Sequence, residues 1–126
     1  MDVKVVLSSE EILRGLKHYR RIAKQDLLLA AESENPAAFT RHAEARRGVY
    51  GHLAEIAQTK SPAEVVKEAL EAYRDLPFVT GSVDEAHTEI KGRENALENF
   101  FLMIGLEPKV RREVRSQRKA MEPSEA

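Results

Sequence analysis

Helix-start patterns divide this chain more clearly than any other feature of its sequence. Ser8 and Glu11 have the spacing of a capping box, in which each side chain accepts a hydrogen bond from the other residue's backbone N–H at the first turn of a helix. The segment 61–64, Ser-Pro-Ala-Glu, combines the same spacing with proline at the first helical position, and Asn35-Pro36 joins an N-cap residue to a proline. These patterns predict a series of helices joined by short connections.

Apolar residues at helical spacing, such as Ile12, Leu16 and Ala23, fill the segments between these starts. Ser82 and Glu85 form a further capping box, and Gly105 is a natural residue for ending a helix. The predicted helices run from Ser8 to Asn35, from Pro36 to about Gln58, from Pro62 to the connector 76–81, from about Val83 to Ile104 and from Pro108 to about Ala120.

Short connections favour antiparallel neighbours, so the predicted fold is all-α, a bundle of four main helices plus a C-terminal basic amphipathic helix. With 126 residues, the chain has the size of one domain. We expect a single helical domain over residues 1–120, a flexible tail over 121–126 and an extended lead-in over residues 3–7.

The amino-acid composition excludes several classes of functional site. There is no cysteine, which excludes disulfides, thiolate nucleophiles and thiolate zinc sites. No apolar run approaches the roughly 20 residues of a membrane helix, and the N-terminal apolar stretch is too short for a signal peptide. We therefore expect a cytoplasmic protein with no membrane contact.

Charge is unevenly distributed, although the formal net charge is only −1. Residues 61–98 carry nine acidic and four basic side chains, whereas both ends are mildly basic. An argument for a polyanionic partner must therefore come from local patterns rather than from the net charge.

The segment 109–119 holds six basic residues and a single acid. At ~100° per residue, five of the six fall on one helix face, beside an apolar face: Arg111, Arg112, Arg115, Arg118 and Lys119. Such a stripe suits the phosphates of duplex DNA, and it is our candidate nucleic-acid-binding face. The alternatives are a solvated surface helix and a helix paired with the acidic middle of the chain.

The first predicted helix carries a second basic face, formed by Arg14, Lys17, Arg20, Arg21 and Lys24. Only one aromatic residue lies nearby, so the face lacks the stacking platform that binds single strands. We include Arg14, Lys17, Arg21 and Lys24 among the candidate nucleic-acid-binding residues.

Two predicted helices have polar residues within or at the edge of their apolar faces: His42 and Arg46 on one, His87 and Glu94 on the other. Buried charges need partners. The sequence therefore predicts that Arg46 is buried and paired with a carboxylate, Glu94 first, or that these residues meet at a subunit interface.

A ferritin-like metal site is an alternative interpretation, because Asp84 with His87 and His52 with Glu55 are three residues apart. The second pair lies on a polar helix face, and we expect no metal and no cofactor. Gly48 and Gly51 lie inside a helix, where they indicate close helix contact rather than a phosphate loop. No serine has a nucleophile-elbow context, so no catalytic residue is predicted.

Residues 105–111, Gly-Leu-Glu-Pro-Lys-Val-Arg, resemble a C-terminal pattern of one class of bacteriophage terminase small subunits. In that pattern a helix ends in Gly-Leu, a small polar residue and Pro follow, and Arg comes three residues later. Gly105, Leu106, Pro108 and Arg111 match, whereas Glu107 departs from the usual Ser or Thr. The resemblance covers about residues 83–115, and Gly followed by Pro is also ordinary punctuation between helices.

The resemblance implies an oligomeric, non-catalytic accessory protein for viral genome packaging, which binds viral DNA and regulates a separate motor-nuclease. From the sequence as a whole we expect a non-enzymatic helical subunit that binds nucleic acid or assembles in a nucleoprotein complex. The main alternative is a protein–protein interaction module, and the second is a metal-dependent bundle.

Overall fold

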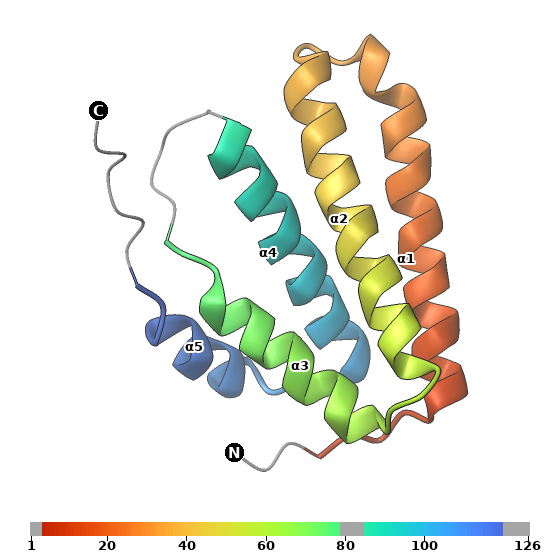
Figure 1. Cartoon of the computed structure of the whole chain (residues 1–126), viewed down its shortest axis with the longest axis vertical. Helices are drawn as coiled ribbons and strands as arrows, with labels where there is room; N and C mark the ends of the chain where they lie inside the picture. Colours follow the sequence, from red (N-terminus) through yellow and green to blue (C-terminus); the bar gives the residue numbers. More distant parts are fainter. Residues whose placement is uncertain (1–3, 79–84, 120–126) are drawn as a thin grey trace.

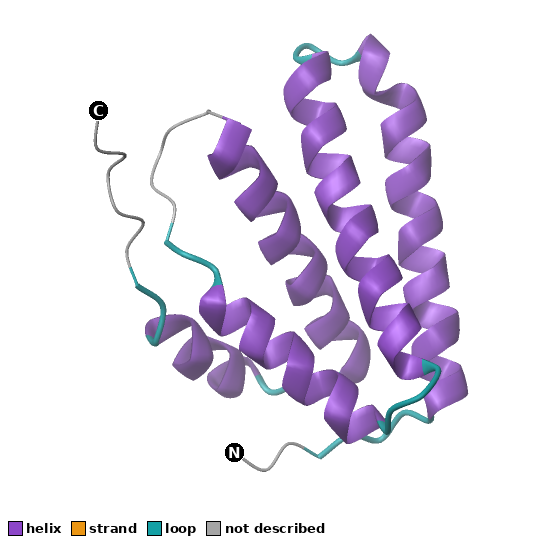
Figure 2. Ribbon diagram, viewed as in Figure 1, coloured by secondary structure: helices purple, strands orange, loops and turns teal. Residues whose placement is uncertain are grey.

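The protein is a bundle of α-helices, as the computed structural model shows for residues 4–78 and 85–119 (Figures 1 and 2). These residues form α1 (Ser9–Leu29), α2 (Pro36–Ala57), α3 (Pro62–Asp75), α4 (Glu85–Ile104) and α5 (Pro108–Ser116), with a short 3-10 turn, Ala30–Glu32, after α1. The predicted all-α class is confirmed. Within the described residues, no helix has both the length and the apolar character needed to cross a membrane.

Local capping explains where the helices begin. At α1, the Ser8 hydroxyl accepts the Glu11 backbone N–H at 3.2 Å, and the Glu11 carboxylate accepts the Ser8 N–H at 3.1 Å. The predicted caps at Asn35 and Ser61 are likewise present, at the starts of α2 and α3. The capping box predicted at Ser82 lies outside the described residues.

Helix α2 is central, with α1 on one side and α4 on the other (Figure 1). The crossing with α4 depends on Gly92, where an added Cβ would lie 2.7 Å from the backbone oxygen of His42. Gly48 has nothing within 4 Å of such a Cβ, so the prediction that it permits close helix contact is wrong. The Cβ at Gly51 would make only an ordinary contact, 3.7 Å from Arg20.

Aromatic residues fill the core between the helices. Tyr50, Tyr73, Phe100 and Phe101 are fully buried, and the rings of Tyr73 and Phe101 meet edge to face with their centres 5.2 Å apart. The hydroxyl of Tyr50 accepts a hydrogen bond from Asn99 at 3.0 Å, and burial raises the pKa of this tyrosine. The buried apolar residues of α1 belong to the same cluster, so α1, α2, α3 and α4 pack around one apolar centre.

The turn between α4 and α5 is set by Gly105, whose φ of 73° lies in the left-handed region that favours glycine. The N–H of Leu106 reaches back to the carbonyl of Phe101 at 2.9 Å, which closes the end of α4 as a Schellman-type cap. Pro108 then begins α5. This helix ends at Ser116, not at about Ala120 as predicted, so Arg118 and Lys119 lie beyond it.

Candidate nucleic-acid interface

Three residues of the predicted basic stripe, Arg111, Arg115 and Arg118, lie against carboxylates of α4. Arg111 lies 3.2 Å from the carboxylate of Glu98 and donates a hydrogen bond of 3.4 Å to the hydroxyl of Tyr73. That hydroxyl donates to the same carboxylate at 2.7 Å. Burial and the hydrogen bond to Glu98 raise the pKa of Tyr73. The hydrogen bond to Tyr73 is the main cause that raises the pKa of Arg111, and the nearby charge of Glu98 is a smaller one.

Arg118 is the clearest departure from the predicted stripe, because its side chain is 0% exposed. Its Nε donates to the backbone carbonyl of Tyr73 at 2.8 Å, and a terminal nitrogen pairs with Glu94. The guanidinium also lies over the Tyr73 ring, 4.0 Å from its centre. The prediction of a solvent-facing Arg118 is therefore wrong. The cause is the early end of α5, since helical spacing no longer describes residue 118.

The remaining cations of the predicted stripe differ in their surroundings. Arg115 is half exposed, 3.8 Å from Glu94 and stacked over the ring of Phe78 at 5.2 Å. Arg112 and Lys119 are exposed, and neither forms an ion pair with a described residue. The five residues therefore do not form one open phosphate-binding face, because three of them pair with the acidic middle of the chain. We call Glu94, Glu98, Tyr73, Arg111 and Arg118 the α4–α5 network.

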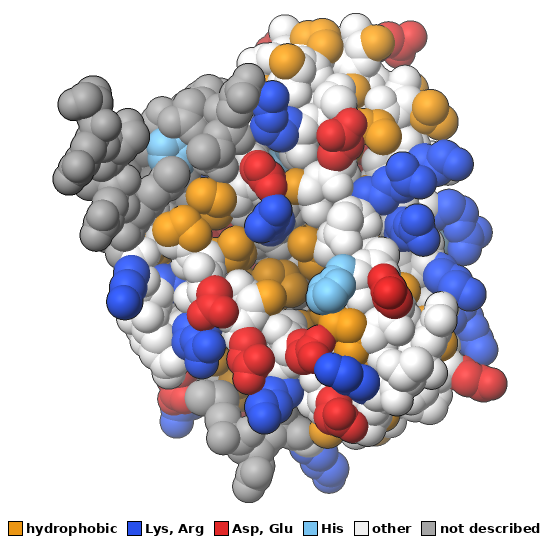
Figure 3. Space-filling model, viewed as in Figure 1, with side chains coloured by type: hydrophobic (Ala, Val, Ile, Leu, Met, Phe, Trp, Pro, Cys, Tyr) orange, Lys and Arg blue, Asp and Glu red, His pale blue; other side chains and the backbone are white. Residues whose placement is uncertain are grey.

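The outer face of α1 has the open arrangement that α5 lacks. All five of its cations are exposed, and none forms an ion pair with any described residue: Arg14, Lys17, Arg20, Arg21 and Lys24. In Figure 3, Lys and Arg side chains line the edge of the molecule along which α1 runs. Arg14 and Lys24 are separated by about 15 Å, from the ~1.5 Å rise per residue of a helix. The apolar side of the same helix, with Ile12, Leu16 and Ala23, is fully buried and fixes this face outward.

Arg46 is largely buried and paired, as predicted, but with a different partner. Its side chain is 12% exposed and lies 2.8 Å from Asp26 on α1, while Glu94 belongs to the α4–α5 network. The imidazole of His42 is half-buried near both charges of this pair. Burial and the charge of Arg46 lower the pKa of His42, whereas the charge of Asp26 raises it by a smaller amount. Arg46 and His42 on α2 thus belong to a different network from Glu94 on α4.

The sequence contained a pattern that could have identified the α4–α5 network. Glu94 and Glu98 are four residues apart on α4, and Arg111, Arg115 and Arg118 follow at spacings of four and three. Two stripes of opposite charge on consecutive helices are a reason to expect pairing. Asp26 had no such indicator, because a single acid on an apolar helix face does not identify its partner.

Nothing in the described part of the chain brings together three or more metal-ligating side chains. His52 and Glu55 are exposed on α2, His87 is half-buried on α4, and Asp84 lies outside the described residues. Comparison with known protein families, with curated proteins and with solved structures finds no match to this chain.

Proposed function

We propose that this protein is a non-enzymatic helical subunit that binds the phosphate backbone of duplex nucleic acid through the outer face of α1. The observation that carries the proposal is that Arg14, Lys17, Arg20, Arg21 and Lys24 are exposed on one helix face and unpaired among the described residues. When unpaired cations of this kind neutralise the phosphates of a duplex, the salt ions condensed on the duplex are released, and this release favours binding.

The geometry of the α1 face suits contacts to the phosphates of a duplex rather than contacts to its bases. The α1 face is straight and about 15 Å long, and B-DNA presents one negative charge per ~1.7 Å of its axis. Contacts to phosphates position a protein without reading sequence. We therefore expect weak binding without sequence preference by one copy, with Kd of about 10⁻⁴–10⁻⁶ M at physiological salt. Several copies bound side by side would strengthen it.

A narrower form of this proposal is an accessory role in viral DNA packaging, in an oligomer or larger assembly. Its support is the resemblance of residues 105–111 to terminase small subunits. In this structure Gly105, Leu106 and Pro108 serve the turn between helices, and Arg111 binds within the α4–α5 network. The test is whether a motor-nuclease gene lies beside the gene of this protein and, where it does, whether the two co-expressed products are pulled down together.

The test of DNA binding is fluorescence anisotropy on a labelled duplex across a salt series. Four phosphate contacts predict a slope near −3.6 for log affinity against log salt, so binding should weaken about a hundredfold between 50 and 200 mM salt. The triple variant Arg14→Glu, Lys17→Glu, Arg21→Glu should abolish binding at low salt while its circular dichroism spectrum stays unchanged.

A matched control carries the same change of charge at exposed positions elsewhere: Lys67→Glu, Lys109→Glu and Arg112→Glu. It should retain most of the affinity, because only long-range charge is altered. Absence of binding by the wild-type protein at low salt would overturn the proposal, and so would an equal loss in the control variant.

A further inference from the structure

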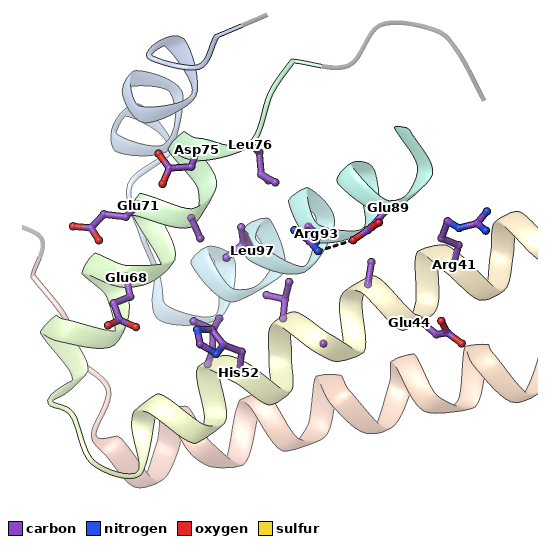
Figure 4. A pocket seen from close by; sticks show the side chains of 15 residues that line it. Arg41, Glu44, His52, Glu68, Glu71, Asp75, Leu76, Glu89, Arg93 and Leu97 are labelled. Carbon is purple, nitrogen blue, oxygen red and sulfur yellow. Dashed lines mark hydrogen bonds and ion pairs between the residues drawn. The ribbon is translucent and has the colours of Figure 1, made fainter. Parts of the chain in front are cut away.

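A cleft of about 1000 Å³ opens between α2, α3 and α4, away from the basic face of α1 (Figure 4). Its floor is apolar, with Val49 and Leu53 on α2, Ala72 on α3, Leu76 directly after α3, and Leu97 on α4. Gly48 also lines it and has no side chain to fill the space. In Figure 3 the same region shows apolar side chains with carboxylates and Lys or Arg side chains around them.

The rim of this cleft is acidic. Five carboxylates line it, against two arginines: Glu44, Glu68, Glu71, Asp75 and Glu89. Glu44 and Glu71 form no ion pair with a described residue, and the pairs of Glu68 with Lys60 and of Glu89 with Arg93 are at the surface. Exposed pairs of this kind are weak and exchange readily for another cation.

We propose that this cleft binds a basic amphipathic helix of a partner protein. An α-helix with its side chains is about 10 Å wide, so the cleft volume corresponds to roughly two turns. The partner's apolar residues, at i, i+3 or i+4 and i+7, contact the floor, and its Lys and Arg side chains reach Glu44 and Glu71. The acidic rim repels nucleic acid and acidic peptides, which separates this surface from the α1 face.

A second copy of this chain fits the cleft less well, although it has basic helices. Ile12 and Leu16 of α1 are fully buried in its own core, whereas Ile22, Leu28 and Leu29 near the end of the same helix are exposed. The positions between Ile22 and Leu29 that would complete an apolar stripe are the polar Gln25 and Asp26, so a folded copy presents its charges beside an interrupted stripe. A partner helix that exposes both faces satisfies the floor and the rim together.

The experiment is a titration of ¹⁵N-labelled full-length protein with a synthetic amphipathic peptide of leucine and lysine, about 15 residues long with leucines at helical spacing. We expect amide shifts centred on Gly48, His52, Ala72 and Leu97, which line the cleft. A peptide of the same composition in scrambled order should bind at least tenfold more weakly. Shifts spread over the surface, or no binding, would overturn the proposal.

Gly48→Leu blocks the cleft without disturbing the fold, because the position is exposed, helical and surrounded by open space. We expect it to weaken peptide binding at least tenfold, with a melting temperature equal to or above that of the wild type. The control is Gln25→Leu, which adds the same side chain to the exposed surface of α1. Equal affinities of the two variants would contradict the assignment.

Charge reversal provides a second test. The double variant Glu44→Lys, Glu71→Lys should also lower the affinity for the peptide at least tenfold, and the loss should be larger at low salt than at high salt. Glu32→Lys with Glu107→Lys, at exposed positions outside the cleft, should change it little. Sedimentation of the wild-type protein gives the last outcome: self-association that the Glu44 and Glu71 reversals abolish would place a second copy in the cleft and overturn the proposal.

Discussion

Replacing Arg118 with alanine should destabilise the protein far more than replacing an exposed arginine. The substitution removes the donor to the Tyr73 carbonyl at 2.8 Å, the ion pair with Glu94 and the contact with the Tyr73 ring at 4.0 Å. A buried acceptor left without its donor costs about 1–3 kcal/mol. A desolvated cation over an aromatic ring contributes about 1–2 kcal/mol more.

The orphaned carboxylate of Glu94 adds less than a fully buried charge would. Its side chain is 22% exposed, and Arg115 already lies 3.8 Å away. Because these effects overlap, we expect a total loss of about 3 kcal/mol in the free energy of unfolding. A chain of this length is stabilised by roughly 6–19 kcal/mol, so the loss is a substantial share of the whole.

Urea denaturation followed by circular dichroism measures this loss. With a slope near 2 kcal/mol per molar urea, the midpoint should fall by about 1.5 M. Arg118→Lys keeps the charge but not the planar set of donors, and should lose about half as much. Arg112→Ala, at an exposed position of α5, should stay within about 0.5 kcal/mol of the wild type. If Arg118→Ala behaves like Arg112→Ala, the side chain is not buried and the α4–α5 network is wrong.

Three other predictions rest on single contacts. Gly48→Ala should raise stability by about 0.5–1 kcal/mol through helix propensity, whereas Gly92→Ala should lower the melting temperature because its Cβ meets the His42 backbone oxygen; equal effects on thermal melts would reject the helix crossing. His42 has a pKa below its ordinary 6.5, so the unfolded chain binds the proton more readily and stability should fall as pH drops below about 6.5. His42→Gln should flatten that part of a pH series of melts, and an unchanged slope would contradict this. Arg46→Ala should cost about 1–3 kcal/mol in urea titrations, less than for a fully buried pair because Asp26 is 34% exposed, and Asp26→Asn in the same protein should add little more.

The helices could be predicted from sequence because their start patterns act locally. A capping box such as Ser8 with Glu11 involves residues three apart, and nothing distant is needed to form it. The ends were less predictable. The segment after Ser116 has helical composition, but in the structure the chain leaves the helical path and Arg118 contacts Tyr73 and Glu94.

The ion-pair partner of Arg46 could not be predicted either, because it depends on contacts between distant parts of the chain. Arg46 was recognised as a buried cation from its place on an apolar face, which is a property of one helix. Whether Asp26 or Glu94 lies opposite depends on how three helices pack, and the sequence of α2 alone does not contain that information. The candidate site moved from α5 to α1 because exposure, unlike charge, is a tertiary property.

The network around Arg118 also has a consequence for the order of folding. Helices α1 and α2 are neighbours in sequence and can pair early, whereas Arg118 must find a carbonyl 45 residues away along the chain. Contacts between distant segments form after the transition state when the local helices nucleate folding. In stopped-flow experiments, Arg118→Ala should then accelerate unfolding while the refolding rate stays almost constant. The Arg118 side chain would then contribute to kinetic stability, because it slows unfolding of the native state without changing the rate at which that state forms.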